Sequence, residues 1–354
     1  MATNRRQFLQ WSGASLAATQ LNACARNNKE VRLYGGYRDY GNNYGAACIN
    51  QNAELIWKLQ TPARAHEVCL QHDLSLGAVV ARRPGDFIQL FDPQTGQALE
   101  QIIAPANLIF EGHGLFRTSS SGKKQLWATA SLKASSESRL LRYDLDNLTQ
   151  LPEQFAIAGL GPHQMLQPNS LQATDQIVIA IGGWRSEGRT VLNADSFESG
   201  LVFFQPETGT HTFVAVPNPR LSARHMATHG SDLWVAMQLA DPAPTEDVLL
   251  YRYSGDAWHP ATAPEQSWRG FNGYLGSLSI AAGEVVATSP QGHRFGRWSL
   301  QGEPISTTDS LDISAATSIE DQWWISSGVG EVQTASMTMQ SKIFWDNHWV
   351  GHSV

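Results

Sequence analysis

The chain of 354 residues has only three cysteines, and no CxxC or CxxCH sequence occurs in it. These absences argue against a zinc knuckle, thioredoxin-type redox chemistry and covalently attached haem c. A GxSxG nucleophile elbow is also missing, which argues against a serine hydrolase. Beyond the N-terminal segment no stretch keeps an apolar period of 3.6 residues, so the crossover helices of an α/β fold are not expected.

The chain also has fewer basic than acidic residues. The chain has 25 Lys and Arg against 32 Asp and Glu, a formal net charge of −7 at pH 7. This acidic balance argues against nucleic acid or an anionic membrane surface as an electrostatic partner, and it is compatible with cationic ligands.

The N-terminal residues predict export. Arg5 and Arg6 are followed by Phe-Leu and by a mildly apolar stretch from Trp11 to Ala23, the pattern of a twin-arginine (Tat) signal peptide that engages the Tat translocase. The stretch is too short and too polar to span a bilayer. We expect residues 1–23 to be removed, which leaves a net charge of −9 because two arginines are lost. The expected location is the periplasm.

A lipoprotein processing site is predicted at the end of this segment. The sequence Leu21-Asn-Ala-Cys24 places a small residue directly before a cysteine and a leucine three residues before it. Cleavage there makes Cys24 a lipidated N-terminus, with residues 24–31 as a tether and the lipid anchor as the only membrane attachment. The alternative is ordinary cleavage nearby and a free soluble protein. Cys48 and Cys69 could pair in an oxidising compartment, or they could be two small buried apolar side chains.

Two series of residues recur along the chain in step. Four histidines at the heads of strand-like runs, His66, His113, His163 and His225, are separated by 47, 50 and 62 residues. Aromatic segments rich in turn-forming residues recur with them, at Phe91–Gly96, Tyr143–Asp146, Phe204–Gly209, Tyr253–Asp256, Trp298–Gly302 and Trp345–Asn347. Short β-branched or aromatic runs at 176–181, 231–237, 283–288 and 322–326 predict strands. A period of about 46 residues with several short strands in each unit is typical of a propeller blade. Residues 32–354 therefore predict an all-β fold, a seven-bladed β-propeller.

In a propeller the equivalent positions of successive blades converge on one axis. We therefore expect the mouth of the central channel to carry His66, His113, His163, His225, Arg64, Arg83, Arg224 and Ser277. Three interpretations stay open. The ring could bind a transition metal (iron, copper or zinc) through His113 and His163, its arginines could bind a small anion, or the side chains could be structural. Five histidines off the repeat are expected at the surface: His229, His259, His293, His348 and His352.

The ordered set of short motifs resembles a bacterial family of exported propellers, the domain of unknown function 1513. The motifs are Arg64-Ala-His66, Ala81-Arg-Arg-Pro-Gly85, Gly112-His-Gly114, Gly161-Pro-His163, Gly182-Gly183 with a later Leu192-Asn193, Ser222-Ala-Arg-His225, Tyr274-Leu-Gly-Ser277 and Thr288-Ser-Pro-Gln-Gly292. The resemblance implies a seven-bladed propeller of the quinoprotein amine dehydrogenase-like (YVTN-like) shape and a periplasmic location. It also implies iron uptake beside imelysin-like lipoproteins and a di-haem oxidoreductase. The chain departs from the family at Thr129-Ala-Ser131, where relatives carry Thr-Glu-Asn, and after Gly183; both departures remove potential metal ligands.

These observations predict a non-catalytic periplasmic propeller that binds a metal-linked ligand or a partner protein as an accessory of iron acquisition. Two alternatives stay open. One is an enzyme acting on a small anionic substrate at the channel mouth, with His113 or His163 as general base and Arg83 or Arg224 orienting the anion. The other is a scaffold that docks envelope proteins on its outer rim.

Overall fold

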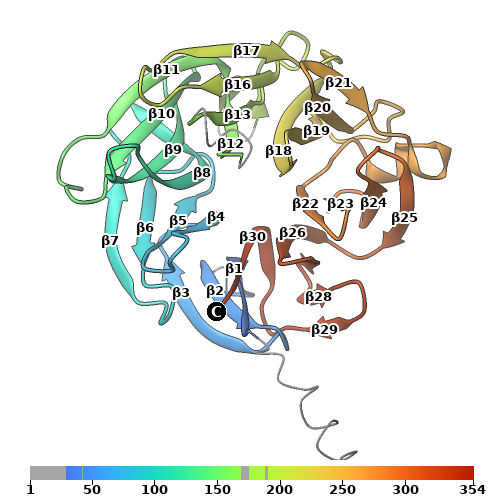
Figure 1. Cartoon of the computed structure of the whole chain (residues 1–354), viewed down its shortest axis with the longest axis horizontal. Helices are drawn as coiled ribbons and strands as arrows, with labels where there is room; N and C mark the ends of the chain where they lie inside the picture. Colours follow the sequence, from blue (N-terminus) through green and yellow to red (C-terminus); the bar gives the residue numbers. More distant parts are fainter. Residues whose placement is uncertain (1–28, 42, 169–174, 188–189) are drawn as a thin grey trace, which may run out of the picture.

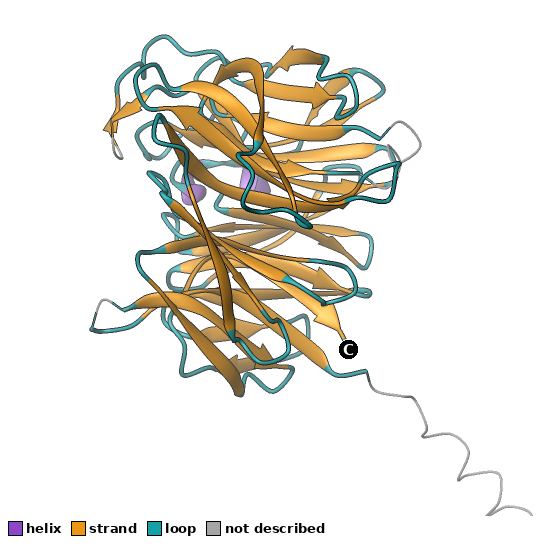
Figure 2. Cartoon of the chain, turned by 90° about the vertical axis from the view of Figure 1, so that its left-hand side faces the viewer, coloured by secondary structure: helices purple, strands orange, loops and turns teal. Residues whose placement is uncertain are grey.

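A computed structural model describes residues 29–41, 43–168, 175–187 and 190–354. The predicted signal peptide (residues 1–23) and Cys24 lie outside these residues. Strands make up almost all regular structure in the described part, and its two 3-10 helices, η2 (Pro264–Gln266) and η3 (Arg269–Phe271), are single turns (Figure 2). None of the described helices has the length and apolar character needed to cross a membrane. The predicted all-β class is confirmed.

Seven antiparallel sheets of four strands each surround a central axis (Figure 1). We number these blades by their first strand in the chain and give the strands from the axis outward. Blade 1 has β30 (Trp345–Ser353), β1 (Val31–Arg38), β2 (Tyr44–Asn50) and β3 (Leu55–Thr61), and blade 2 has β4 (Ala65–Leu70), β5 (Gly77–Ala81), β6 (Phe87–Phe91) and β7 (Ala98–Ile103). Blade 3 has β8 (Leu108–Thr118), β9 (Lys124–Leu132), β10 (Glu137–Asp144) and β11 (Glu153–Leu160). Blade 4 has β12 (Pro162–Leu166), β13 (Ile177–Ile181), β16 (Gly200–Phe204) and β17 (His211–Ala215), with a small hairpin of β14 (Ser186–Glu187) and β15 (Thr190–Val191) inserted.

The remaining three blades follow the same plan. Blade 5 has β18 (Leu221–His229), β19 (Asp232–Leu239), β20 (Leu250–Ser254) and β21 (Ala257–Pro260). Blade 6 has β22 (Ser277–Ala281), β23 (Glu284–Ser289), β24 (Arg294–Ser299) and β25 (Pro304–Asp309), and blade 7 has β26 (Ile313–Ile319), β27 (Gln322–Ser327), β28 (Glu331–Gln333) and β29 (Thr338–Gln340). The prediction of a seven-bladed propeller is confirmed.

Blade 1 is assembled from both ends of the described chain. Strand β30 pairs antiparallel with β1, from Val31 opposite Ser353 to Tyr37 opposite Trp345. This pairing joins the last blade to the first, so the innermost strands β30, β4, β8, β12, β18, β22 and β26 contact one another around a closed ring. Closure leaves no open edge between the first and last blades. The assignment of Trp345–Asn347 to the turn series is wrong, because these residues begin the innermost strand β30.

Blade interiors are built as the composition predicts. The predicted strand runs correspond to β13, β19, β23 and β27, and all five residues of β13 are buried. Branched side chains on both faces of such a strand pack against the two neighbouring blades. Tryptophan fills the wider gaps: Trp268 and Trp298 are buried and stack with ring centroids 5.6 Å apart.

The innermost strands are irregular near the axis. Six of them, β4, β8, β12, β18, β26 and β30, are bulged in their first half, and only β22 pairs with its neighbour without a shift in register. A bulge adds an unpaired residue and changes the direction of its side chain. His66 occupies the bulge of β4, between Ala65 and Glu67, and Arg224 that of β18. In β8 Gly112 takes a φ of +103°, in the region that favours glycine, beside His113. These bulges allow polar side chains to turn toward the axis.

Candidate functional site

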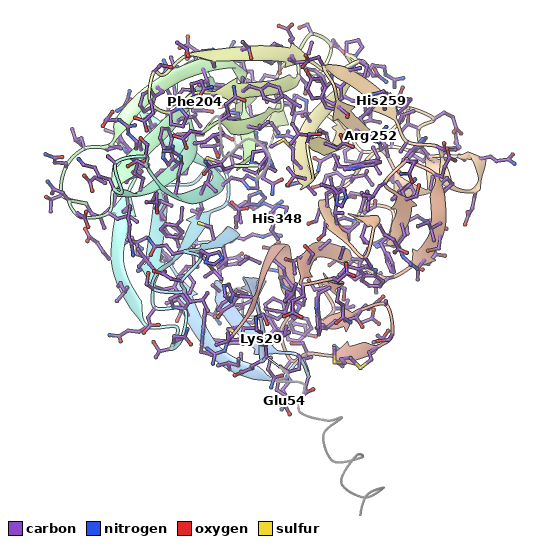
Figure 3. All side chains as sticks on the ribbon, viewed as in Figure 1. Lys29, Glu54, Phe204, Arg252, His259 and His348 are labelled. Atoms are coloured by element: carbon purple, nitrogen blue, oxygen red, sulfur yellow. The ribbon has the colours of Figure 1, made fainter. Side chains whose placement is uncertain are left out.

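Five histidines converge on the axis of the propeller. They come from five innermost strands: His66 from β4, His113 from β8, His163 from β12, His225 from β18 and His348 from β30. The structure thus brings the four repeating histidines together and adds a fifth. The expectation that His348 lies at the surface is wrong, because its side chain is 7% exposed and lies near the centre of the molecule (Figure 3). We call these five residues the histidine ring.

The nitrogens of the histidine ring are close enough to share an ion. His66 Nε2 lies 3.1 Å from His113 Nε2. Two nitrogens that each lie about 2.1 Å from one metal are about 3.0 Å apart at a right angle and about 3.4 Å apart at the tetrahedral angle. Two sets of three histidines have ligating nitrogens within 4.8 Å of one another: His66, His113 and His348, and His113, His163 and His225. His113 belongs to both sets.

Contacts between Nδ1 and an acceptor oxygen orient two rings, an ion-pair contact without hydrogen-bond geometry for His113 and a hydrogen bond for His163. His113 Nδ1 lies 3.2 Å from a Glu67 carboxylate oxygen, which also accepts a hydrogen bond of 2.9 Å from the backbone N–H of Gly114. His163 Nδ1 lies 3.2 Å from the backbone carbonyl of Arg224. A carbonyl can only accept, so His163 Nδ1 carries the proton and His163 Nε2 keeps a lone pair; the carboxylate beside His113 favours a proton on Nδ1 of that ring as well. Metal-binding histidines are commonly held in this way.

Four ring nitrogens are not used by the protein. His66 Nδ1, His113 Nδ1, His225 Nδ1 and His348 Nε2 are buried and have no hydrogen-bond partner among the described residues. Buried polar atoms are normally hydrogen-bonded, so four such atoms in one cluster indicate a site for a ligand or for water. Burial is the main cause that lowers the pKa of His66, His225 and His348 well below the ordinary value, and neighbouring histidines lower it further. Burial and His113 have the same effect on the pKa of His163. These four imidazoles are therefore neutral at pH 7, the form that binds a metal.

A cavity of about 620 Å³ opens onto the histidine ring. Four ring members line it, His66, His163, His225 and His348, together with Arg38, Arg64, Arg82, Arg83 and Arg224. We call it the arginine cavity. His113 is fully buried and is not among the lining residues, so a molecule in the cavity reaches His66 and His163 before it reaches His113. A second cavity of about 280 Å³ also touches His225 and His348 and is lined by Glu67.

Several arginines of the cavity have carboxylate partners. Arg64 forms two hydrogen bonds with the Asp346 carboxylate, and Arg82 Nη1 lies 3.5 Å from the same group. Arg83 Nε lies 3.6 Å from the Glu111 carboxylate, which is an ion pair without hydrogen-bond geometry. Asp346 is therefore neutralised by two guanidinium groups, whereas Arg83 keeps donors for another acceptor.

Arg224 is the most unusual arginine of the cavity. Its side chain is 2% exposed and lies over the Trp184 ring, 3.6 Å from the ring centroid. Its Nε and Nη2 atoms have no hydrogen-bond partner in the described part of the chain. Burial, and then the neighbouring charge of Arg83, lowers the pKa of Arg224 to about 9. Arg224 is still a cation at pH 7, and it lines the cavity with two buried donors that have no hydrogen-bond partner among the described residues.

The other predicted residues lie elsewhere. Ser277 is buried at the second cavity, where its hydroxyl accepts a hydrogen bond of 3.1 Å from the backbone N–H of Ala316 and thereby joins blades 6 and 7. The surface prediction is confirmed for His229, His259 and His293, and Figure 3 shows His259 in the outer part of its blade. His352 is half-buried.

The two described cysteines are not paired. Cys48 is buried, Cys69 is half-buried, and both thiols are free. Burial raises the pKa of Cys48 to about 12 and that of Cys69 well above its ordinary value. Of the two alternatives, the disulfide is not present; Cys48 is a small buried side chain as expected, whereas Cys69 is half-buried.

Comparisons with known proteins identify the family and the fold. The family described as "Protein of unknown function (DUF1513)" matches residues 59–352, so the chain belongs to that family. No curated protein matches the chain. Among solved structures, hydrazine synthase of Kuenenia stuttgartiensis has a TM-score of 0.61 at 10% identity over 84% of this chain and 90% of its own. Apo AztD from Citrobacter koseri has a TM-score of 0.55 at 9% identity, over 91% of this chain and 98% of its own. A functionally unknown protein from Desulfotomaculum acetoxidans has a TM-score of 0.55 at 8% identity, over 90% of this chain and 98% of its own. At these identities the likeness shows the propeller fold alone.

Proposed function

We propose that this member of the family of unknown function is a periplasmic metal-binding propeller that holds a transition-metal ion in the histidine ring and serves iron acquisition without catalysing a reaction. The observation that carries the proposal is the 3.1 Å separation of His66 Nε2 and His113 Nε2 inside a cluster of five imidazoles. Neutral imidazole nitrogens suit iron, copper and zinc.

The chemistry of the ring supports metal binding more than a structural role. Five imidazoles at one point give few hydrogen bonds to one another, since a neutral imidazole has one donor and one acceptor. Four of their buried nitrogens have no hydrogen-bond partner among the described residues, and an unsatisfied buried polar atom costs about 1–3 kcal/mol. A metal ion bound to these lone pairs would offset that cost, and Glu67 would strengthen His113 as a ligand.

The assignment to iron acquisition rests on the family resemblance and on the predicted export signal. Export through the Tat system with Cys24 as the lipidated residue would place the ring in the periplasm, where imported metal passes. The envelope proteins proposed as partners are an imelysin-like lipoprotein and a di-haem oxidoreductase. In this proposal the ion is cargo that the propeller receives and transfers.

The test is the metal content of protein purified from the periplasm, measured by elemental mass spectrometry beside a His113→Asn, His163→Asn double variant. We expect close to one iron, copper or zinc per chain in the wild type and its loss in the double variant. The matched control is His259→Asn, because His259 is exposed and lies away from the axis (Figure 3). Wild-type protein that stays metal-free in excess Fe²⁺, Cu²⁺ and Zn²⁺ would overturn the proposal. Equal metal content in the folded double variant would place the metal elsewhere.

A further inference from the structure

The arginine cavity has the features of an anion site next to the histidine ring. Its volume of about 620 Å³ is in the range of small-molecule pockets and exceeds the need of a single ion. The same cavity is lined by His66, His163, His225 and His348. A molecule of this size can therefore contact guanidinium groups and imidazoles at the same time.

Arg224 provides the strongest indication of what the cavity binds. Its fork is held on the face of Trp184, at 3.6 Å from the ring centroid, while Nε and Nη2 have no partner among the described residues. The pair of Nε–H and one Nη–H donors matches the two oxygens of a carboxylate. A guanidinium that is 2% exposed loses hydration, so an anionic acceptor in the cavity would restore its hydrogen bonds.

The cavity is also lined by four carboxylates, Asp39, Glu111, Asp312 and Asp346, so its five arginines leave a small excess of positive charge. Arg83 faces Glu111 at 3.6 Å without a hydrogen bond, so its donors are available as well. The two arginines are near enough for the charge of one to act on the other. The buried Glu111 carboxylate acts on both arginines and offsets part of this repulsion, and an anion between the two would offset more of it.

We infer that the arginine cavity binds a small polycarboxylate. One carboxylate of this ligand is held by the guanidinium groups of Arg224 and Arg83, and another of its groups binds the metal ion in the histidine ring. The protein would thus receive its metal as an anionic chelate, and the anion would remain as a shared ligand. The chelate part of this inference rests on the proposed function, whereas carboxylate binding by the arginines does not require the metal.

Three variants separate the roles in this site. Arg224→Gln and Arg83→Gln each remove one guanidinium. Gly182→Ala keeps every charge but places a methyl group 2.8 Å from Arg224 Nη1, so it displaces the fork. Arg220→Gln is the matched control, because Arg220 is exposed, pairs with Asp247 and does not line the cavity.

Calorimetric titration of metal-free protein with citrate, and separately with inorganic phosphate, tests the anion site. We expect citrate to bind more tightly than phosphate, and each of the three variants to weaken citrate binding at least about tenfold, the loss expected for a charge-assisted hydrogen-bonded pair. Arg220→Gln should bind citrate as the wild type does. Should Arg224→Gln fail to fold, Arg83→Gln and Gly182→Ala provide the same test.

Metal linkage then tests the chelate. Because coupling between two ligands is reciprocal, citrate should tighten metal retention by the ring, and His113→Asn should abolish this effect but leave citrate binding to metal-free protein intact. Citrate binding that is unchanged in all three variants, or that is absent with and without metal, would overturn the inference even if the ring binds metal. If citrate binding depends on the arginines but the histidine ring never binds metal, the proposed function and the chelate part of the inference are overturned. The anion site in the arginine cavity then still stands. Phosphate binding tighter than citrate would overturn the carboxylate assignment.

Discussion

Replacement of Glu67 by glutamine isolates the contribution of one carboxylate to the histidine ring. Glu67 is not a member of the histidine ring, but one of its carboxylate oxygens lies 3.2 Å from His113 Nδ1. A carboxylate that accepts the Nδ1 proton makes Nε2 a better donor to a metal and holds the ring plane. Glutamine has the same size and can still accept a hydrogen bond, so Glu67→Gln removes the charge and preserves the shape.

The expected effect follows from similar contacts in other metal sites. Loss of such a partner typically weakens metal affinity by about 10–100-fold, which corresponds to about 1.4–2.7 kcal/mol. The hydrogen bond of 2.9 Å from the Gly114 N–H to Glu67 can be kept by the glutamine carbonyl oxygen, so we expect only a small change in the stability of the metal-free protein. Binding stoichiometry should stay at that of the wild type, since all five histidines remain.

The assay is competition with a chromophoric chelator, performed with Zn²⁺ and, under anaerobic conditions, with Fe²⁺. Glu284→Gln is the matched control: Glu284 is 20% exposed against 15% for Glu67, and it forms two hydrogen bonds with Arg297. Thermal unfolding of metal-free protein shows whether each variant is folded. If Glu67→Gln bound metal as tightly as the wild type, our reading of His113 as a ligand held by Glu67 would be refuted. If Glu284→Gln weakened binding equally, the effect would be general and not local.

Three further predictions concern the fold and the N-terminus. Trp349→Ala should lower the free energy of unfolding in urea by about 3–5 kcal/mol. The reason is that Trp349 is 6% exposed and covers Gly35 where β30 closes the propeller. A decrease below about 1 kcal/mol would mean that closure does not depend on this contact. Thiol titration of a Cys24→Ser variant with a disulfide reagent at pH 8 should detect Cys48 only after denaturation and Cys69 only slowly before it, because burial raises the pKa of both thiols and the thiolate is the reactive form. Rapid reaction of both thiols in the native variant would contradict this assignment. Cys24→Ser should move the exported protein from the membrane fraction to the soluble periplasmic fraction, and an unchanged membrane fraction in cell fractionation would argue against lipidation at that residue.

The fold could be predicted because its signals are local and repeated. Each hairpin between the two outer strands of a blade needs turn chemistry, as at Gly96, which takes a φ of +72° between β6 and β7 and donates its N–H to the Asp92 carbonyl. Such turns, together with short branched strands such as β13, recur in every part of the chain. The sequence contains no comparable signal for closure of the propeller by β30, because Trp345 and Asp346 have the composition of a turn segment and yet begin this strand.

The site could be predicted only in part. The even spacing of His66, His113 and His163 indicated a common axis, but 123 residues separate His225 from His348, and the intervening innermost strands β22 and β26 carry serine at this level. The contact between Glu67 and His113 joins the innermost strands of two consecutive blades through residues 46 positions apart in the chain, and neither residue type indicates the contact by itself. The bulge that turns Arg224 onto Trp184 depends on the register of β18 against β19, which composition does not determine.

The position of the histidine ring bears on why the chain keeps it. The axis of a propeller is where the innermost strands meet, and apolar side chains there would be expected to stabilise the fold more than neutral imidazoles with unpaired nitrogens. Local departures from good packing occur at functional sites and are offset elsewhere in a structure; the branched and aromatic blade interiors supply that stability here. Because His66, His113 and His348 come from three blades, including the blade that β30 completes, one ion bound to this set would join blades 1, 2 and 3. Metal binding and closure of the propeller should therefore be coupled, and an ion present at 100 times its dissociation constant would add about 2.7 kcal/mol to the free energy of unfolding.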